Sequence, residues 1–220
     1  MTTAPVTSPD VTVRNASITR LLAAGAVAGP LFVTATLVQA ATREGFDPVV
    51  HPLSMLSLSE LGWIHIANFV IAGLLALAGA FGLRAALTEG PGRVWGPRLF
   101  AVYGFALVWA GVFTADPAFG YPIGTPEGAP AELSWHGVLH SFAPAGASLS
   151  LVVACIVFAR RYAREGRGLW AGVCVAAAVL DLGLTGASFA LADYRFMFAG
   201  GAVIWVWAAA VCFDALRRNR

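Results

Sequence analysis

The chain has 220 residues, of which 58% are hydrophobic and only 12% are charged, and its mean hydropathy is +0.74. A soluble globular domain carries about 25% charged residues, so this composition excludes an ordinary soluble enzyme or binding domain. The basic residues are not interleaved with aromatic ones, which argues against nucleic acid as a partner.

Six apolar runs follow one another along the chain, each close to the roughly 20 residues that a helix needs to cross a membrane. They cover residues 18–41, 62–87, 97–115, 135–159, 169–191 and 196–215. The sequence therefore predicts an all-α, polytopic membrane protein, with residues 18–215 folded as a bundle of six transmembrane helices. Residues 1–17 lack apolar periodicity and are expected to form a disordered cytoplasmic tail. Residues 216–220 are expected to form a short basic cytoplasmic tail.

The basic residues are distributed unevenly between the two sides of this bundle. The chain has no lysine, and its 14 basic residues are all arginine. If the N-terminus is cytoplasmic, only Arg43 and Arg195 fall on the outer side. Because positively charged connections remain in the cytoplasm, we expect both termini to be cytoplasmic and the protein to lie in the cell membrane. Membrane lipids, anionic ones included, are the expected partners.

Glycines at helical spacing predict close helix packing. Gly25 and Gly29 stand four residues apart, as do Gly168 and Gly172, which is the pattern that lets membrane helices approach closely. Such pairs arise easily in a chain with 24 glycines. They therefore indicate tight packing within the bundle and leave a homo-oligomer open.

The first long outer connection, residues 42–61, has one polar and one apolar side. Pro52 suits the first turn of a helix, and Ser54, Ser57 and Glu60 recur every three residues after it. The apolar side consists of Leu53, Met55, Leu56, Leu58 and Leu61. This pattern predicts a short interfacial helix that covers the outer end of the bundle as a lid.

All four histidines fall on the outer side, at His51, His65, His136 and His140. His136 and His140 share one helix face and could bind a metal ion together with His65 and a carboxylate such as Asp116. The Glu that follows the first His in zinc proteases is absent. We therefore expect a hydrogen-bonded polar cluster without a cofactor, and keep zinc, or a haem with axial histidines, as alternatives.

Asp181 stands in the middle of the fifth apolar run. An ionised carboxylate at the centre of a bilayer costs about 2.5–3.5 kcal/mol, so this side chain must be neutral, face the bundle or pair with a donor. Donors at a similar depth include Ser148, Ser150 and Asn68. A structural interhelical hydrogen bond and a site that handles protons or ions both fit.

Several of these residues together resemble a known signature. The matching residues are Arg43-x-Gly45-Phe46-Asp47-Pro48, His51-Pro52-Leu53-Ser54, Leu56-Ser57, Gly62-Trp63, Asn68-Phe69, Asp116-Pro117, His136-Gly137 and His140. The chain resembles the domain-of-unknown-function 998 family over residues 18–215, and more loosely the Frag1 and DRAM type of membrane protein. The resemblance implies a six-helix integral membrane protein of bacteria or archaea. It implies no catalytic residue and no substrate.

These features predict a non-enzymatic membrane protein that handles a lipid or small ligand through an outward-facing polar pocket. The candidate residues of the pocket are Arg43, Asp47, His51, Ser54, Ser57, Glu60, His65, Asn68, Asp116, His136, His140 and Asp181. A metal-dependent lipid hydrolase at the outer leaflet and a b-type haem protein are the alternative functions.

Overall fold

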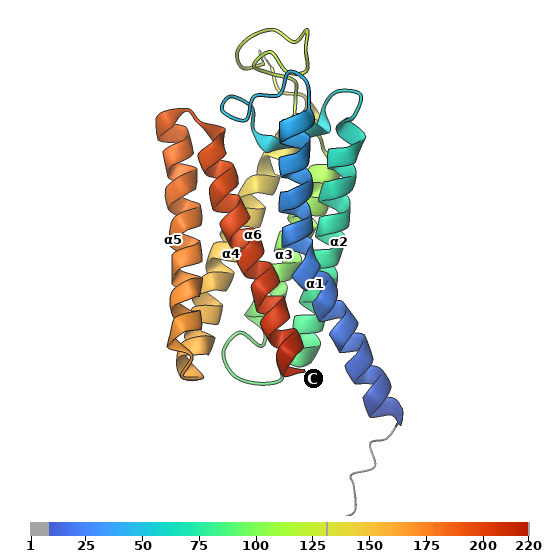
Figure 1. Cartoon of the computed structure of the whole chain (residues 1–220), viewed down its shortest axis with the longest axis vertical. Coiled ribbons are helices and arrows are strands. Elements are labelled where there is room, and N and C mark those ends of the chain that lie inside the picture. The colour runs from blue at the N-terminus through green and yellow to red at the C-terminus, as the bar shows by residue number, and fades with distance from the viewer. Residues whose placement is uncertain (1–8, 131, 220) are drawn as a thin grey trace, which may run out of the picture.

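The computed structural model describes residues 9–130 and 132–219. In this part of the chain there are six α-helices and one short 3₁₀ helix. They are α1 (Pro9–Thr42), η1 (Leu53–Ser57), α2 (Gly62–Ala86), α3 (Trp95–Val112), α4 (Trp135–Arg164), α5 (Gly168–Leu191) and α6 (Tyr194–Arg218). The all-α fold predicted from the apolar runs is confirmed (Figure 1).

Five of these helices are long and apolar enough to cross a membrane, namely α1 from Val13 onward, α2, α4, α5 and α6. The remaining helix, α3, has 18 residues and begins with Trp95-Gly96-Pro97-Arg98, which lowers its hydropathy. The lengths and composition of the five helices make the chain a multi-pass membrane protein.

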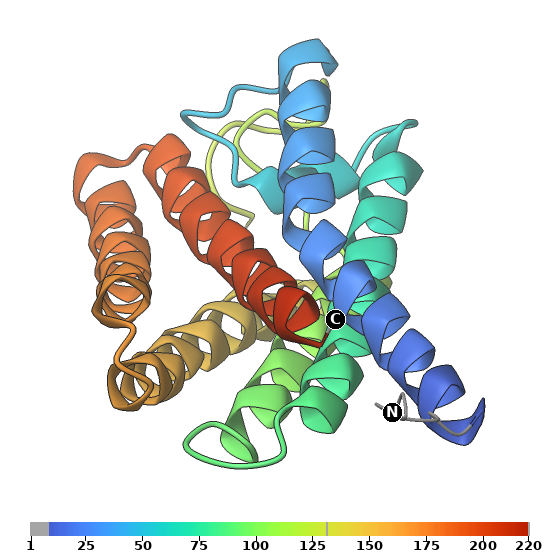
Figure 2. The same ribbon diagram turned by 60° about the horizontal axis from the view of Figure 1, so that its bottom comes forward.

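Consecutive helices lie side by side with alternating directions, and α6 also contacts α1, which closes the bundle (Figure 2). Because α6 further contacts α2 and α4, it lies toward the middle, whereas α5 packs mainly on α4 and α6 at one edge. Residues 43–61, 113–134 and 192–193 connect helices at one end of the bundle, which we term the loop end. The opposite end, where α1 begins and α6 finishes, carries Arg161, Arg167 and Arg218, and we term it the basic end.

The two terminal helices extend beyond the predicted runs. α1 begins at Pro9, so residues 9–17 are helical and the prediction of disorder is wrong for them; residues 1–8 lie outside the described residues. No Gly or Pro stands between residues 10 and 24, and a helix already formed in the span extends at the low cost of adding one residue at a time. α6 likewise continues to Arg218, into the predicted basic tail.

Close backbone contact holds α1 against α2 and α6. A Cβ added to Gly25 would lie 2.6 Å from Cα of Gly79 on α2 and 2.7 Å from Sγ of Cys212 on α6. A Cβ on Gly29 would overlap the carbonyl group of Trp205 on α6. The structure thus agrees with the predicted close approach at the first glycine pair.

The second glycine pair has a different environment. No described residue lies within 4 Å of a Cβ added to Gly168 or Gly172, so the prediction of close packing there is wrong. The reason is the position of α5 at the edge of the bundle, where only one of its sides meets other helices.

These two environments predict opposite responses to the same added methyl group. Gly29→Ala is expected to lower the free energy of unfolding by about 1–3 kcal/mol, because the methyl group forces α1 away from α6. Gly172→Ala is expected to be neutral, or stabilising by up to about 1 kcal/mol through helix propensity. Thermal unfolding of both variants in the same detergent measures the difference. Equal losses in the two variants would contradict the assigned packing.

Candidate functional site

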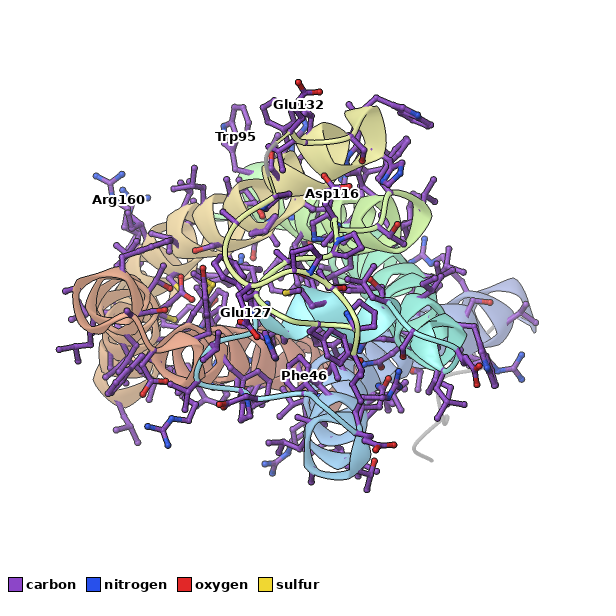
Figure 3. The ribbon with its side chains drawn as sticks, turned by 90° about the horizontal axis from the view of Figure 1, so that it is seen from above. Phe46, Trp95, Asp116, Glu127, Glu132 and Arg160 are labelled. Carbon is purple, nitrogen blue, oxygen red and sulfur yellow. The ribbon has the colours of Figure 1, made fainter. Side chains whose placement is uncertain are left out.

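His51 joins the two long loops at the loop end. Its Nδ1 accepts a hydrogen bond from the backbone N–H of Asp47 at 2.9 Å, so Nε2 carries the proton and donates to the carbonyl of Phe119 at 2.9 Å. The buried ring also contacts the rings of Phe46 and Tyr121, with centroids 5.5 and 5.3 Å away. The loops that carry Phe46 and Glu127 consequently lie together over this end (Figure 3). Both nitrogens of His51 are used to hold loops in place.

The aspartates at the loop end stabilise turns and helix starts. Each accepts a hydrogen bond of 2.9 Å from a backbone N–H, in the pairs Asp47 with Val49, Asp116 with Ser134, and Asp193 with Arg195. Hydrogen bonds from the Arg195 side chain also hold the pKa of the Asp193 carboxyl below its usual value. These three carboxylates lie at one end, as the sequence pattern indicates, and their observed contacts are those of caps.

Arg43 fastens the segment that follows η1 to the end of α1. Its Nη1 donates to Oγ of Ser59 at 2.9 Å, and its Nη2 donates to the carbonyl of Leu61 at 3.1 Å. A longer bond of 3.4 Å reaches the carbonyl of Leu56. Because a guanidinium has five N–H donors in a fixed plane, one side chain holds the lid at several points.

The lid itself is shorter than predicted. η1 has five residues, and Met55 and Leu56 are buried as the apolar pattern indicates. Ser57 is buried too, although the pattern places it on the polar side; its hydroxyl donates to the carbonyl of Ser54 at 2.6 Å, which satisfies it locally. The helix ends because the backbone of Leu58 is extended, with φ −92° and ψ 175°, and Ser59 after it has a positive φ of 70°. Glu60 is exposed.

His136 belongs to the cap of α4. Oγ of Ser134 accepts from the N–H of Gly137 at 3.1 Å and donates to Asp116 Oδ1 at 2.5 Å. Nδ1 of His136 lies 3.0 Å from the same hydroxyl, 3.2 Å from the carbonyl of Thr114 and 4.0 Å from Asp116. Gly137 is required here, because a Cβ would overlap the carboxylate of Asp116.

His65 is fully buried one helix turn below the lid, with an exposed fraction of 0%. Its Nδ1 lies 3.3 Å from Nε2 of Gln39, whose amide is oriented because Nε2 donates to Ala35 and Oε1 accepts from Arg43. An amide NH₂ only donates, so Nδ1 of His65 accepts and Nε2 carries the proton. Among the described residues, this Nε2 has no hydrogen-bond partner.

His140 has the complementary arrangement. Its Nδ1 donates to the carbonyl of Phe113 at 2.6 Å, so its Nε2 is an unprotonated acceptor. The ring is buried, and within residues 9–130 and 132–219 nothing bonds to this Nε2 either. Two buried imidazoles therefore provide one unused donor and one unused acceptor.

In the structure, the three histidines of the predicted cluster have two kinds of environment. His136 belongs to the cap of α4, whereas His65 and His140 are buried. His136 and His140 share a helix face, but their Nδ1 atoms bind different carbonyls, those of Thr114 and Phe113. In the part of the chain that the structure describes, no three His, Cys, Asp or Glu side chains are arranged as a metal site. The four-residue spacing of His136 and His140 predicts that they share a helix face, but it does not predict the direction in which each ring points.

Two further candidates join pairs of helices in the interior. Nδ2 of Asn68 donates to the carbonyl of Phe32 at 3.2 Å and to Oγ1 of Thr36 at 3.3 Å, which connects α2 to α1. Asp181 is 2% exposed, and its Oδ2 accepts from Oγ of Ser148 at 2.6 Å, which connects α5 to α4. Ser148 is a hydroxyl donor of the kind that a carboxyl group at this depth requires.

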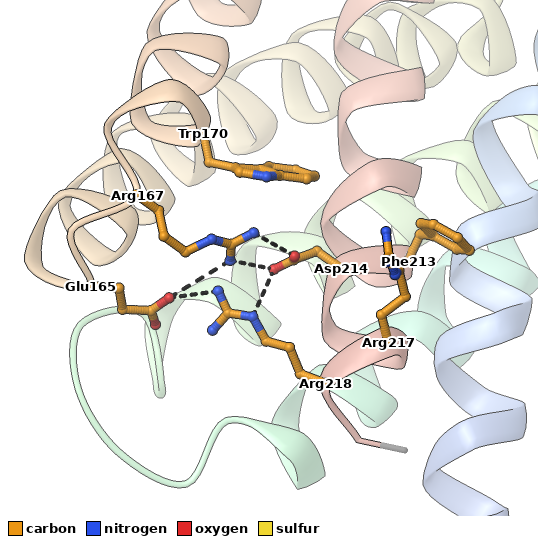
Figure 4. A pocket seen from close by; sticks show the side chains of 7 residues that line it. All are labelled: Glu165, Arg167, Trp170, Phe213, Asp214, Arg217 and Arg218. Carbon is orange, nitrogen blue, oxygen red and sulfur yellow. Dashed lines mark hydrogen bonds and ion pairs between the residues drawn. The ribbon is translucent and has the colours of Figure 1, made fainter.

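A cavity of about 820 Å³ opens at the basic end, between the α4–α5 turn and the last turns of α6 (Figure 4). Its lining residues are Glu165, Arg167, Trp170, Phe213, Asp214, Arg217 and Arg218. The arginine distribution predicts topology and gives no indication of this cavity. The sequence feature that could have indicated this cavity is Asp214, an acidic residue that lies near the end of an apolar run and four residues before an arginine.

The hydrogen bond between Asp181 and Ser148 predicts different effects for two substitutions. Asp181→Asn is expected to change the free energy of unfolding by less than about 1 kcal/mol, because the amide oxygen accepts the same bond. Ser148→Ala is expected to cost about 1–3 kcal/mol, because it leaves a buried carboxyl group unpaired. Thermal unfolding in detergent compares the two. A larger loss for Asp181→Asn would show that the carboxylate charge itself is needed.

Comparison with known proteins gives one match. Residues 26–214 match the family described as "Protein of unknown function (DUF998)". No curated protein and no solved structure matches the chain. The match covers most of the chain, including every helix from the middle of α1 to the last turns of α6, and the chain therefore belongs to the DUF998 family of proteins of unknown function.

Proposed function

We propose that this protein is a six-span protein of the cell membrane that binds a lipid or small ligand beneath its outer loops, with both termini in the cytoplasm. The orientation is supported by the arginines, of which only Arg43 and Arg195 belong to the loop end. Retention of positive charge places the basic end in the cytoplasm. The loop end then faces outward.

The proposal counts α3 as a sixth span. Its 18 residues correspond to about 27 Å of helix at ~1.5 Å per residue, close to the ~30 Å of a hydrocarbon core. It lies between α2 and α4 in the bundle. Its contact with α2 is close, since a Cβ on Gly73 would lie 2.7 Å from the carbonyl oxygen of Gly104. A helix enclosed in this way by two spanning neighbours crosses with them.

Single cysteines test the orientation. Ala129→Cys, exposed at the loop end, is expected to react with a membrane-impermeant maleimide on intact cells. Thr88→Cys, exposed at the basic end, is expected to react only after the membrane is opened. The native Cys155, Cys174 and Cys212 are buried, so the wild type serves as the unlabelled control. The reverse labelling pattern would place both termini outside.

The ligand proposal depends on one observation, the two unused Nε2 atoms of His65 and His140. An unpaired buried polar atom costs about 1–3 kcal/mol, and buried polar groups in native proteins are almost always paired with protein or water. One atom is a donor and the other an acceptor. The group that matches both is a hydroxyl, an amide or a protonated carboxyl, carried by a lipid or a small molecule.

The lid supports a ligand site at this place. η1 packs against α1 and α2, and Arg43, which holds the segment after η1, is also an electrostatic neighbour of His65. Side-chain hydrogen bonds hold this segment in place. When the segment opens, bonds to water replace them, and the net cost in free energy is small. The segment is therefore the part of the loop end best suited to open for a ligand.

A double substitution separates ligand binding from folding. In His65→Asn the amide oxygen replaces Nδ1 as acceptor, and in His140→Asn the amide nitrogen replaces Nδ1 as donor, so both structural hydrogen bonds persist. Each substitution removes the Cε1 and Nε2 atoms of the ring, and the second polar atom of the amide takes the approximate place of Cδ2. Native mass spectrometry of the purified protein is expected to show a bound species on the wild type and to show at least a tenfold lower occupancy on the double variant, the equivalent of about 1.4 kcal/mol.

The control for this experiment is His136→Asn, which alters a partly exposed imidazole in the cap of α4 and leaves both buried Nε2 atoms in place. It is expected to retain the bound species. A wild type that carries no bound species, or a double variant that carries it at the same occupancy, would refute the proposed site. Melting temperatures of all three proteins show whether each variant is folded.

A further inference from the structure

The basic-end cavity holds a network of charges that is not fully neutralised. Asp214 binds Arg167 through two hydrogen bonds, of 2.8 and 2.6 Å, and also pairs with Nε of Arg218 at 3.2 Å. Glu165 pairs with Nη2 of Arg218 at 2.7 Å. Three guanidinium groups and two carboxylates line the cavity, which leaves one positive charge in excess.

Arg217 is the arginine of this cavity that is available to a ligand. Among the described residues, no carboxylate lies within 4.0 Å of its guanidinium, which instead lies 6.0 Å from the ring of Phe213. Figure 4 shows it beside Phe213 and apart from the pairs made by Arg167, Asp214 and Arg218. The uncompensated charge of the cavity is therefore located at an exposed side chain.

In the rest of the cavity, two guanidinium groups and two carboxylates balance in charge and hold one another in place. Arg167 lies against the rings of Tyr162 and Trp170, at 4.7 and 5.1 Å from their centroids, so its position is fixed by these two rings and by Asp214. α5 begins beside it without a side-chain cap on its first N–H groups. The start of a helix carries partial positive charge and donors that favour a phosphate. A fixed site also loses less conformational entropy on binding.

The rim of the cavity is apolar. Phe213, which lines the cavity, is 50% exposed, and Leu169, which precedes the lining residue Trp170 in the chain, is 82% exposed. Both belong to helices that are long and apolar enough to cross a membrane. A free phosphate in water would gain nothing from these side chains, whereas a lipid has acyl chains that cover them. The combination favours a lipid over a soluble anion.

We propose that the basic-end cavity binds the phosphate of an anionic membrane lipid, with Arg217 as its direct contact and with Phe213 and Trp170 beside the glycerol and upper acyl chains. A phosphate oxygen accepts a charge-assisted hydrogen bond from the guanidinium. With the orientation proposed above, the lipid belongs to the inner leaflet. Binding itself does not depend on that orientation or on the site at His65 and His140.

Native mass spectrometry with added phosphatidylglycerol tests the assignment, with phosphatidylcholine as the zwitterionic comparison and glycerol 3-phosphate as the head group without acyl chains. The wild type is expected to prefer phosphatidylglycerol over both. Arg217→Gln is expected to weaken phosphatidylglycerol binding about fivefold, the effect of one arginine near an anionic lipid. Arg217→Lys keeps the charge and is expected to retain most of the binding.

The matched control is Arg160→Gln, which removes the same charge from an exposed residue at the same end that does not line the cavity. It is expected to bind phosphatidylglycerol as the wild type does. Equal weakening by both Gln variants would show diffuse attraction to a basic surface, and tight binding of glycerol 3-phosphate would show a site for a soluble anion. Either result, or equal binding of phosphatidylcholine, would overturn the proposal. His65→Asn/His140→Asn is expected to leave this site unchanged.

Discussion

Close contact of helix backbones is the constraint on which this structure depends, because helices in lipid gain no hydrophobic driving force from meeting one another. α1 meets α2 and α6 through Gly25 and Gly29, where side chains would not fit. This contact aligns the upper part of α1 with α2, so that Gln39 reaches His65. It also fixes α6 in the middle of the bundle, from where Asp214 reaches the α4–α5 turn. Both candidate sites follow from the placement of these three helices.

The two ends of the bundle use different kinds of polar interaction. At the loop end, imidazoles and carboxylates mostly bind backbone groups, as His51 does with Phe119 and Asp116 with Ser134. At the basic end, guanidinium groups bind carboxylates and lie against aromatic rings. Bonds to the backbone determine loop shape, whereas ion pairs between long side chains tolerate exposure to water. The loop end is consequently a covered interior and the basic end an open charged surface.

Two polar side chains within the spans, Asn68 and Asp181, are paired with neighbouring helices. Asn68 binds the backbone of α1, and Asp181 binds Ser148 of α4. These bonds satisfy groups that would be costly in lipid and set the rotation of each helix about its axis. The Nε2 atoms of His65 and His140 and the hydroxyl groups of Tyr103 and Ser188 are buried without a partner among the described residues, and the proposed ligand site depends on the two histidine atoms.

The sequence by itself determined the class of protein, the approximate bounds of the helices and the end at which the His and Asp residues gather. Hydropathy and arginine distribution suffice for this because crossing a membrane depends on the composition of each run alone. It did not determine that α1 begins at Pro9, or that Gly168 and Gly172 lie at an open edge, since these depend on what each segment meets. Only the tertiary structure decided which nitrogen of each histidine is used and that Arg167 and Asp214 enclose a cavity. Hydrogen bonds and ion pairs join residues far apart in the chain, and their partners are fixed by the packing of the helices.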